Sequence, residues 1–244
     1  MPHPSPESGS AAKDPLAWLT GLEGVPSAFA ATRDGIDVML RDRGLRRTTP
    51  QQTAESLLRG AQASAELAGS TSSLAEVRTG NGDAIAQAAV RVSTALLSLV
   101  PVIGRSPAQA FARLQALTGG STPGQPVSPE AAQRLQSLSQ TMLRTRAPAL
   151  LVAALVHADL QTASPFAEHN GIVARAAERL VLVGRGVDPA SLVIPEAGHL
   201  ALRAAYESNL RGYRDGGTPG LHSWLLYAAE AQAKGAEASP LPTG

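Results

Sequence analysis

The chain has 244 residues, of which 43% are apolar and 17% charged, a globular composition that excludes an intrinsically disordered chain. The formal net charge of +1 excludes the broad positive field of a general nucleic-acid binder. The absence of cysteine excludes disulfides and thiolate-based zinc sites.

Aromatic residues make up only 3% of the chain, so its core must be built mainly from Ala, Leu and Val. Ala is the best helix former and a poor strand former, so this composition favours closely packed helices over a β-sandwich. Two short apolar runs, at 181–183 and 192–194, are too short to count as strands. The sequence therefore predicts an all-α protein.

A Ser, Thr or Asp followed by Pro recurs along the chain and marks helix starts, since the first side chain can cap free N–H groups and Pro fits the first turn. With the apolar spacing of three and four residues that follows, these pairs predict helices at 15–31, 34–43, 50–68, 84–99, 107–117, 129–144, 147–163, 170–184, 198–213 and 218–234.

Pro, Ser, Gly and Ala dominate both ends of the chain, which predicts disordered tails at 1–13 and 235–244 around a single domain at 14–234. The Gly- and Pro-rich segment 118–128 predicts an exposed loop. The first residues lack the pattern of a signal peptide, and the longest apolar run noted, 149–156, is too short to span a bilayer. These features predict a cytoplasmic protein with no membrane partner.

Two further features have ordinary structural interpretations. The basic stretch at 41–47 has no interleaved aromatic residues for base stacking, and Gly44 is typical of the residue that follows a helix. It therefore predicts a helix end rather than a nucleic-acid site. His199 and His222 are scattered in the sequence and indicate no metal cluster.

The most informative segment is SPFAEHNGIVAR at residues 164–175. Pro165 ends one helix, and Phe166 is expected to anchor the following loop in the core. Asn170 and Gly171 then open the next helix, whose free N–H groups and positive dipole end favour an anion.

Two charged side chains complete this candidate phosphate site. Glu168 supplies a carboxylate that could hold Mg²⁺, and Arg175 lies four to five residues into the helix, from where it could reach back to a phosphate. Structural interpretations compete with both: Glu168 or Asn170 as a helix cap, and Arg175 in an ion pair with Glu168 or Glu178. The sequence leaves these alternatives open.

The segment resembles the signature of the Fic (Fido) family, HPFx[D/E]GNGRxxR. The matching positions are Pro165, Phe166, Glu168, Asn170, Gly171 and Arg175. His157 matches a histidine common upstream in the family, although a hydrogen-bonded core histidine is the stronger interpretation, and Trp224 matches a tryptophan of the last helix. The likeness is specific over about 147–234, and the loop at 118–128 falls where the family has a β-hairpin flap that docks the target segment.

This resemblance implies an all-helical Fic-type bundle with a short irregular flap. It also implies transfer of AMP, or another phosphate-containing group, from ATP to a hydroxyl of a target protein. In that scheme a histidine is the general base, the acidic residue binds Mg²⁺, and the loop amides, asparagine and arginines hold the phosphates.

Three positions depart from the signature: Ser164 replaces the catalytic histidine, His169 replaces a glycine, and Ile172 replaces the first arginine. Serine is no base near neutral pH, and isoleucine makes no polar contact with phosphate. We therefore expect a degenerate site that binds ATP and Mg²⁺ through Phe166, Glu168, Asn170, Gly171 and Arg175 with little or no AMP transfer. Two alternatives stay open: an active transferase that uses His169 as a substitute base, and a helical protein-interaction module without a ligand.

Overall fold

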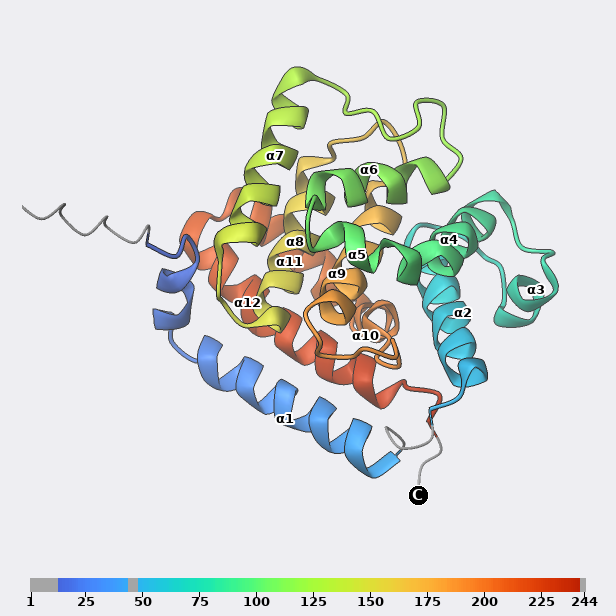
Figure 1. Ribbon diagram of the computed structural model, residues 1–244, viewed down its shortest axis with the longest axis horizontal. Helices are drawn as coiled ribbons and strands as arrows, with labels where there is room; N and C mark the ends of the chain where they lie inside the picture. Colours follow the sequence, from blue (N-terminus) through green and yellow to red (C-terminus); the bar gives the residue numbers. More distant parts are fainter. Residues whose placement is uncertain (1–12, 44–47, 242–244) are drawn as a thin grey trace, which may run out of the picture.

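The computed structural model describes residues 13–43 and 48–241, which are mostly helical and contain no β-strand (Figure 1). The elements are η1 (Ala17–Gly21), α1 (Val25–Arg43), α2 (Pro50–Leu67), α3 (Leu74–Thr79), α4 (Ala84–Ala95), η2 (Leu96–Leu99), α5 (Val100–Ile103), α6 (Pro107–Leu117), α7 (Pro129–Arg144), α8 (Ala149–Ala163), α9 (Asn170–Gly184), α10 (Pro195–Ala201), α11 (Arg203–Asp215) and α12 (Gly217–Glu237). The predicted all-α class is confirmed.

Proline and capping residues set several helix starts as expected. Helices α2, α6 and α7 begin at Pro50, Pro107 and Pro129. The side chain of Thr49 accepts a hydrogen bond from the N–H of Gln52, and that of Ser128 accepts one from the N–H of Ala131. These oxygens satisfy backbone donors that the first turn of a helix leaves free.

Other boundaries differ from the sequence prediction. The two helices expected at 15–31 and 34–43 are instead a short 3₁₀ helix and the continuous helix α1. The helix expected at 198–213 starts earlier, at Pro195, and breaks at Leu202 into α10 and α11. Helix α3 was not expected, although a capping box between Ser73 and Glu76 starts it.

The chain ends differ in part from the expected tails. Helix α12 continues to Glu237, and Leu241 is buried, so the boundary expected at 234 is wrong for residues 235–241. Residues 1–12 and 242–244 of the predicted tails lie outside the described residues, as do residues 44–47 of the basic stretch.

Helices α8 and α9 pack along each other in the middle of the bundle, with α12 across them and α1 on the outside (Figure 1). Helix α8 is apolar on nearly every side, and α9 is buried continuously from Ile172 to Val183. A helix with apolar residues all round is typical of a core position. The segment 164–169 connects these two central helices, so the core fixes both of its ends.

A helical run from Ala84 to Ile103 is long and apolar enough to cross a membrane by length and composition. The expectation from the sequence concerned only uninterrupted apolar runs, and Gln87 and Arg91 interrupt this one. The core helix of a soluble protein can have the same length and composition. Val92, Leu96 and Leu99 of this run are buried in the hydrophobic core.

Candidate functional site

The motif loop, residues 164–171, begins where α8 ends. Ser164 has a left-handed backbone conformation with φ of 44°, which terminates the helix and exposes its side chain. Its hydroxyl donates to the carbonyl of Gln161, 3.2 Å away. Ser164 is therefore at the surface of the loop, at the position of the family's histidine, but its hydroxyl is engaged with the end of its own helix.

Asn170 closes the motif loop on Phe166. The N–H of Phe166 donates to Oδ1 of Asn170 at 3.0 Å, and Nδ2 of Asn170 donates to the carbonyl of Phe166 at 2.7 Å. The ring of Phe166 is buried, as expected from the sequence. Asn170 is not the N-cap of α9; its amide holds the loop in shape, while the N-cap residue is His169.

The flap, residues 118–128, lies against the motif loop. Its N–H at Val127 donates to the carbonyl of Pro165 at 2.9 Å, and Pro126 forms an isolated antiparallel bridge with Phe166. The hydroxyl of Ser121 donates to Oε1 of Glu168 at 2.8 Å. The described flap is an irregular segment fastened to the motif loop rather than a hairpin paired with itself.

Glu168 and His169 lie side by side at the outer edge of the loop. Nε2 of His169 is 3.8 Å from Oε2 of Glu168, and the two side chains are 25% and 45% exposed. His169 has a left-handed φ of 61°, a conformation that favours the glycine found here in the family signature. The carboxylate of Glu168 bonds to Ser121 and does not cap α9.

The N-cap residue of α9 makes no side-chain cap hydrogen bond, and the amide groups and positive dipole end of such a helix start favour an anion. At Gly171 an added Cβ would lie 2.9 Å from Oε1 of Gln161 and 3.2 Å from Nη1 of Arg175. Glycine therefore lets this turn lie directly on the polar groups beneath it. Ile172, in contrast, is buried in the core.

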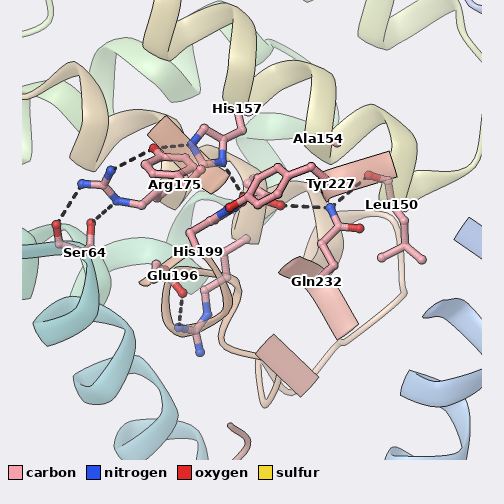
Figure 2. Close-up of polar contacts among 12 residues, drawn as sticks. Ser64, Leu150, Ala154, His157, Arg175, Glu196, His199, Tyr227 and Gln232 are labelled. Carbon is pink, nitrogen blue, oxygen red and sulfur yellow. Dashed lines mark hydrogen bonds and ion pairs between the residues drawn. The ribbon is translucent and has the colours of Figure 1, made fainter. Parts of the chain in front are cut away.

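Arg175 is buried beneath this turn rather than exposed to a ligand. Its Nε donates to Oγ of Ser64 at 2.9 Å, and its two terminal nitrogens donate to the carbonyl of Ser64 and to the hydroxyl of Tyr206 (Figure 2). The expected direct ion pair with Glu168 or Glu178 is not among the ion pairs of the described residues. Arg175 instead ties α9 to α2 and α11.

Beyond Tyr206 the hydrogen bonds continue to a buried carboxylate on α9. Nε2 of His157 is 2.9 Å from the hydroxyl of Tyr206, and its Nδ1 is 2.6 Å from Oε2 of Glu178. His157 is thus a hydrogen-bonded core histidine, the stronger of the two sequence interpretations. Because Arg175 donates to Tyr206, the tyrosine hydroxyl can donate to His157, which leaves the proton of Nδ1 for Glu178.

A second histidine reaches the same carboxylate from α10. Nε2 of His199 is 2.8 Å from Oε2 of Glu178, and its Nδ1 is 2.9 Å from the hydroxyl of Tyr227. The other carboxylate oxygen accepts from Nε2 of Gln232 at 2.9 Å (Figure 2). Glu178 therefore accepts three hydrogen bonds in the centre of the molecule.

The electrostatics of this cluster follow from burial and pairing. Burial, which penalises the imidazolium form, lowers the pKa of His157 to about 4, and the neighbouring Glu178 only partly opposes this effect. Burial alone would raise the pKa of Glu178, but the two imidazoles and their hydrogen bonds lower it below its usual range. An ionised Glu178 between two imidazoles is therefore the stable arrangement near neutral pH.

His199 is scattered in the sequence but not isolated in the structure, because ligand atoms of His157, Glu178 and His199 lie within 4.8 Å of one another. Their contacts are those of hydrogen bonds, with each imidazole placed between a tyrosine hydroxyl and the carboxylate. We therefore interpret the cluster as structural. His222 lies apart from it and contacts the carbonyl of Glu23.

No family model matches the chain, and no curated protein matches it in sequence. Among solved structures, it is similar to a Fic family protein from Desulfovibrio desulfuricans G20, with a TM-score of 0.70 and 16% sequence identity. The match covers 86% of this chain and 73% of that chain. The resemblance expected from the motif is thereby confirmed for the fold: this chain folds as a Fic-type helical bundle.

Proposed function

We propose that this Fic-type protein binds the phosphate groups of a nucleotide, together with Mg²⁺, at the first turn of α9, with little or no transfer of AMP. The observation that carries the proposal is the pairing of an uncapped helix start with a half-exposed carboxylate, Glu168, directly before it. A positive helix end and a carboxylate that can hold a cation suit a metal-bound phosphate.

The residues present fit such a group in two respects. One is the start of α9, where no side chain caps the first turn and Gly171 adds none. Glu168 would hold Mg²⁺, which usually keeps several water ligands and so needs few carboxylates. Phe166 and Asn170 would shape the loop, and Arg175 would support it from below.

The weak transferase activity in this proposal follows from Ser164. A hydroxyl cannot accept a proton from an attacking hydroxyl near neutral pH, and the loss of a general base costs about 10²–10⁴ in rate. His169 is the substitute base in the alternative proposal. Its nearest charged partner is Glu168, and none of its hydrogen bonds or ion pairs in the described residues involves Ser164.

The test is calorimetric titration of Mg·ATP into the parent protein and Glu168→Gln. We expect saturable binding by the parent and at least tenfold weaker binding by the variant. Glu207→Gln is the matched control, because Glu207 is similarly exposed but pairs with Arg203 on α11. Arg175 is unsuitable for this comparison, since its replacement would damage the core.

Two other outcomes favour the alternatives. The absence of binding up to millimolar Mg·ATP would leave the motif loop as architecture and favour a protein-interaction module. Transfer of label from ATP to protein, lost in His169→Gln, would favour an active transferase with altered chemistry acting on an unidentified protein target.

A further inference from the structure

The flap covers a buried amide that lacks half of its hydrogen bonds. Gln115 on α6 is only 1% exposed, and its Oε1 accepts a hydrogen bond from the N–H of Gly124. Its Nε2 is buried and has no partner among the described residues. A buried donor without a partner has the full free-energy cost of desolvation. Binding of an acceptor to Nε2 would remove that cost, and the flap in this position supplies no acceptor.

The same space contains the carboxylate of the motif loop. A Cβ added to Gly120 would lie 3.1 Å from Nε2 of Gln115 and 3.3 Å from Oε2 of Glu168. Both polar groups therefore lie around one point of the flap backbone, and glycine is the residue that fits between them. Gln115 presents a donor there, and Glu168 presents an acceptor.

The closed flap is held in place by specific contacts. Arg91 donates through Nε to the carbonyl of Leu117 at 3.0 Å and through Nη2 to that of Thr118. At the other side, the hydroxyl of Ser121 donates to Oε1 of Glu168. In this position Ser121 occupies an oxygen that a cation would otherwise contact.

We propose that Gln115 is a ligand-binding residue: when the flap lifts from Glu168, its Nε2 donates to a phosphate oxygen of a magnesium-bound nucleotide, and that ligand displaces Ser121. This inference rests on the proposed function, and it extends the site from the motif loop to α6 and the flap. A phosphate oxygen supplies the acceptor that Nε2 lacks, and Mg²⁺ takes the place of the hydrogen bond that Ser121 donates to Glu168.

The proposal predicts effects of opposite sign for two neighbouring residues. Gln115→Met removes the donor, together with the acceptor for Gly124, with little change in length or volume, and it should weaken Mg·ATP binding about tenfold or more. Ser121→Ala removes the contact that competes for Glu168, and it should tighten binding several-fold. Gln133→Met, at an exposed position of α7, is the matched control and should leave the affinity unchanged.

Calorimetric titration with Mg·ATP on these four proteins separates the outcomes, with urea unfolding as the check that each variant is folded. If the parent binds and Gln115→Met binds within twofold of it, this inference is overturned while the proposed function stands. Equal affinity of Ser121→Ala and the parent would overturn the competition for Glu168. If neither the parent nor Ser121→Ala binds at millimolar Mg·ATP, the proposed function fails and this inference with it. Should Gln115→Met not fold, Gln115→Glu, which keeps an acceptor for Gly124, replaces it and should also weaken binding.

Discussion

His157 and His199, on α8 and α10, contact the same oxygen of one buried carboxylate, Oε2 of Glu178. The edge-to-face contact of their rings, with centroids 4.5 Å apart, places both imidazoles where neither meets water. With Gln232 of α12, four helices thus meet at one negative charge, which makes their packing sensitive to the protonation of the groups around it.

This arrangement predicts that the protein loses stability on mild acidification. The pKa of His157 falls from its ordinary 6.5 to about 4 on folding, so between these values the unfolded chain binds a proton that the native protein does not. The free energy of unfolding therefore falls as the pH drops from about 6.5 towards 4, by up to about 1.4 kcal/mol per pH unit from this residue. The lowered pKa of Glu178 adds a further loss below its ordinary value of 4.5. Urea unfolding at a series of pH values between 7 and 4 measures the slope.

Two variants identify the source of that slope. His157→Gln should be less stable at pH 7 and show a flatter profile, whereas His222→Gln, outside the cluster, should retain the parental profile. The other charged or titratable groups in this cluster are Arg175, His199, Tyr206 and Tyr227, and burial raises the pKa of both tyrosines above the range of the experiment. Stability that stays constant from pH 7 to pH 5 would contradict the assignment.

Arg175 should matter for folding rather than for ligand affinity. Arg175→Met would leave the carbonyl of Ser64 and the hydroxyl of Tyr206 without their buried partner, which should lower the free energy of unfolding by about 3 kcal/mol. The surface pair of Arg134 with Asp159 provides the contrast, and Arg134→Met should cost less than about 1 kcal/mol. Denaturation in urea at pH 7 measures both. Equal small losses in the two variants would show that the buried network contributes little.

The sequence predicted the helical class and many helix starts because both depend on local chemistry. Thr49 with Pro50 and Ser128 with Pro129 start helices through their own side chains and backbone. The break at Leu202 carries no such local signal, since α10 is positioned by its close packing on α12. Boundaries set by tertiary packing are therefore the ones that the sequence pattern missed.

The same distinction between local chemistry and tertiary packing applies to the candidate site. The motif located the loop, its buried Phe166 and the helix start at Asn170. It could not show that Arg175 turns inward to Ser64, because that contact joins segments far apart in the chain. It named Glu178 only as a possible partner of Arg175 and missed its contacts with His157 and His199, which lie far from it in the chain.

Close packing of α10 on α12 makes Gly198 a sensitive position. A Cβ there would lie 1.9 Å from the carbonyl oxygen of Ala231 and 2.8 Å from the backbone N of Gly235, both of which are backbone atoms that cannot turn aside. Gly198→Ala should therefore destabilise the protein by more than about 2 kcal/mol. Gly35→Ala is the matched control, because Gly35 lies in α1 with open space around it and Ala should stabilise that helix by about 0.5–1 kcal/mol. Thermal unfolding should move in opposite directions for the two variants, and a shift in the same direction would contradict the close approach.

Variants that restore the family signature distinguish a departure at an exposed position, Ser164, from one at a buried position, Ile172. Ser164 is exposed and Ile172 is buried, so a histidine fits the first position, whereas an arginine at the second would place a charge in the core. We expect Ser164→His, combined with His169→Gly, to remain folded and to raise transfer of label from ATP to protein by about 10²-fold over the parent, because it supplies the missing base. Adding Ile172→Arg should instead lower the free energy of unfolding by about 3 kcal/mol or more. Labelling assays and urea unfolding on the parent, the double variant and the triple variant measure both effects. A double variant that binds Mg·ATP and still transfers nothing would show that the lost base is not what limits activity.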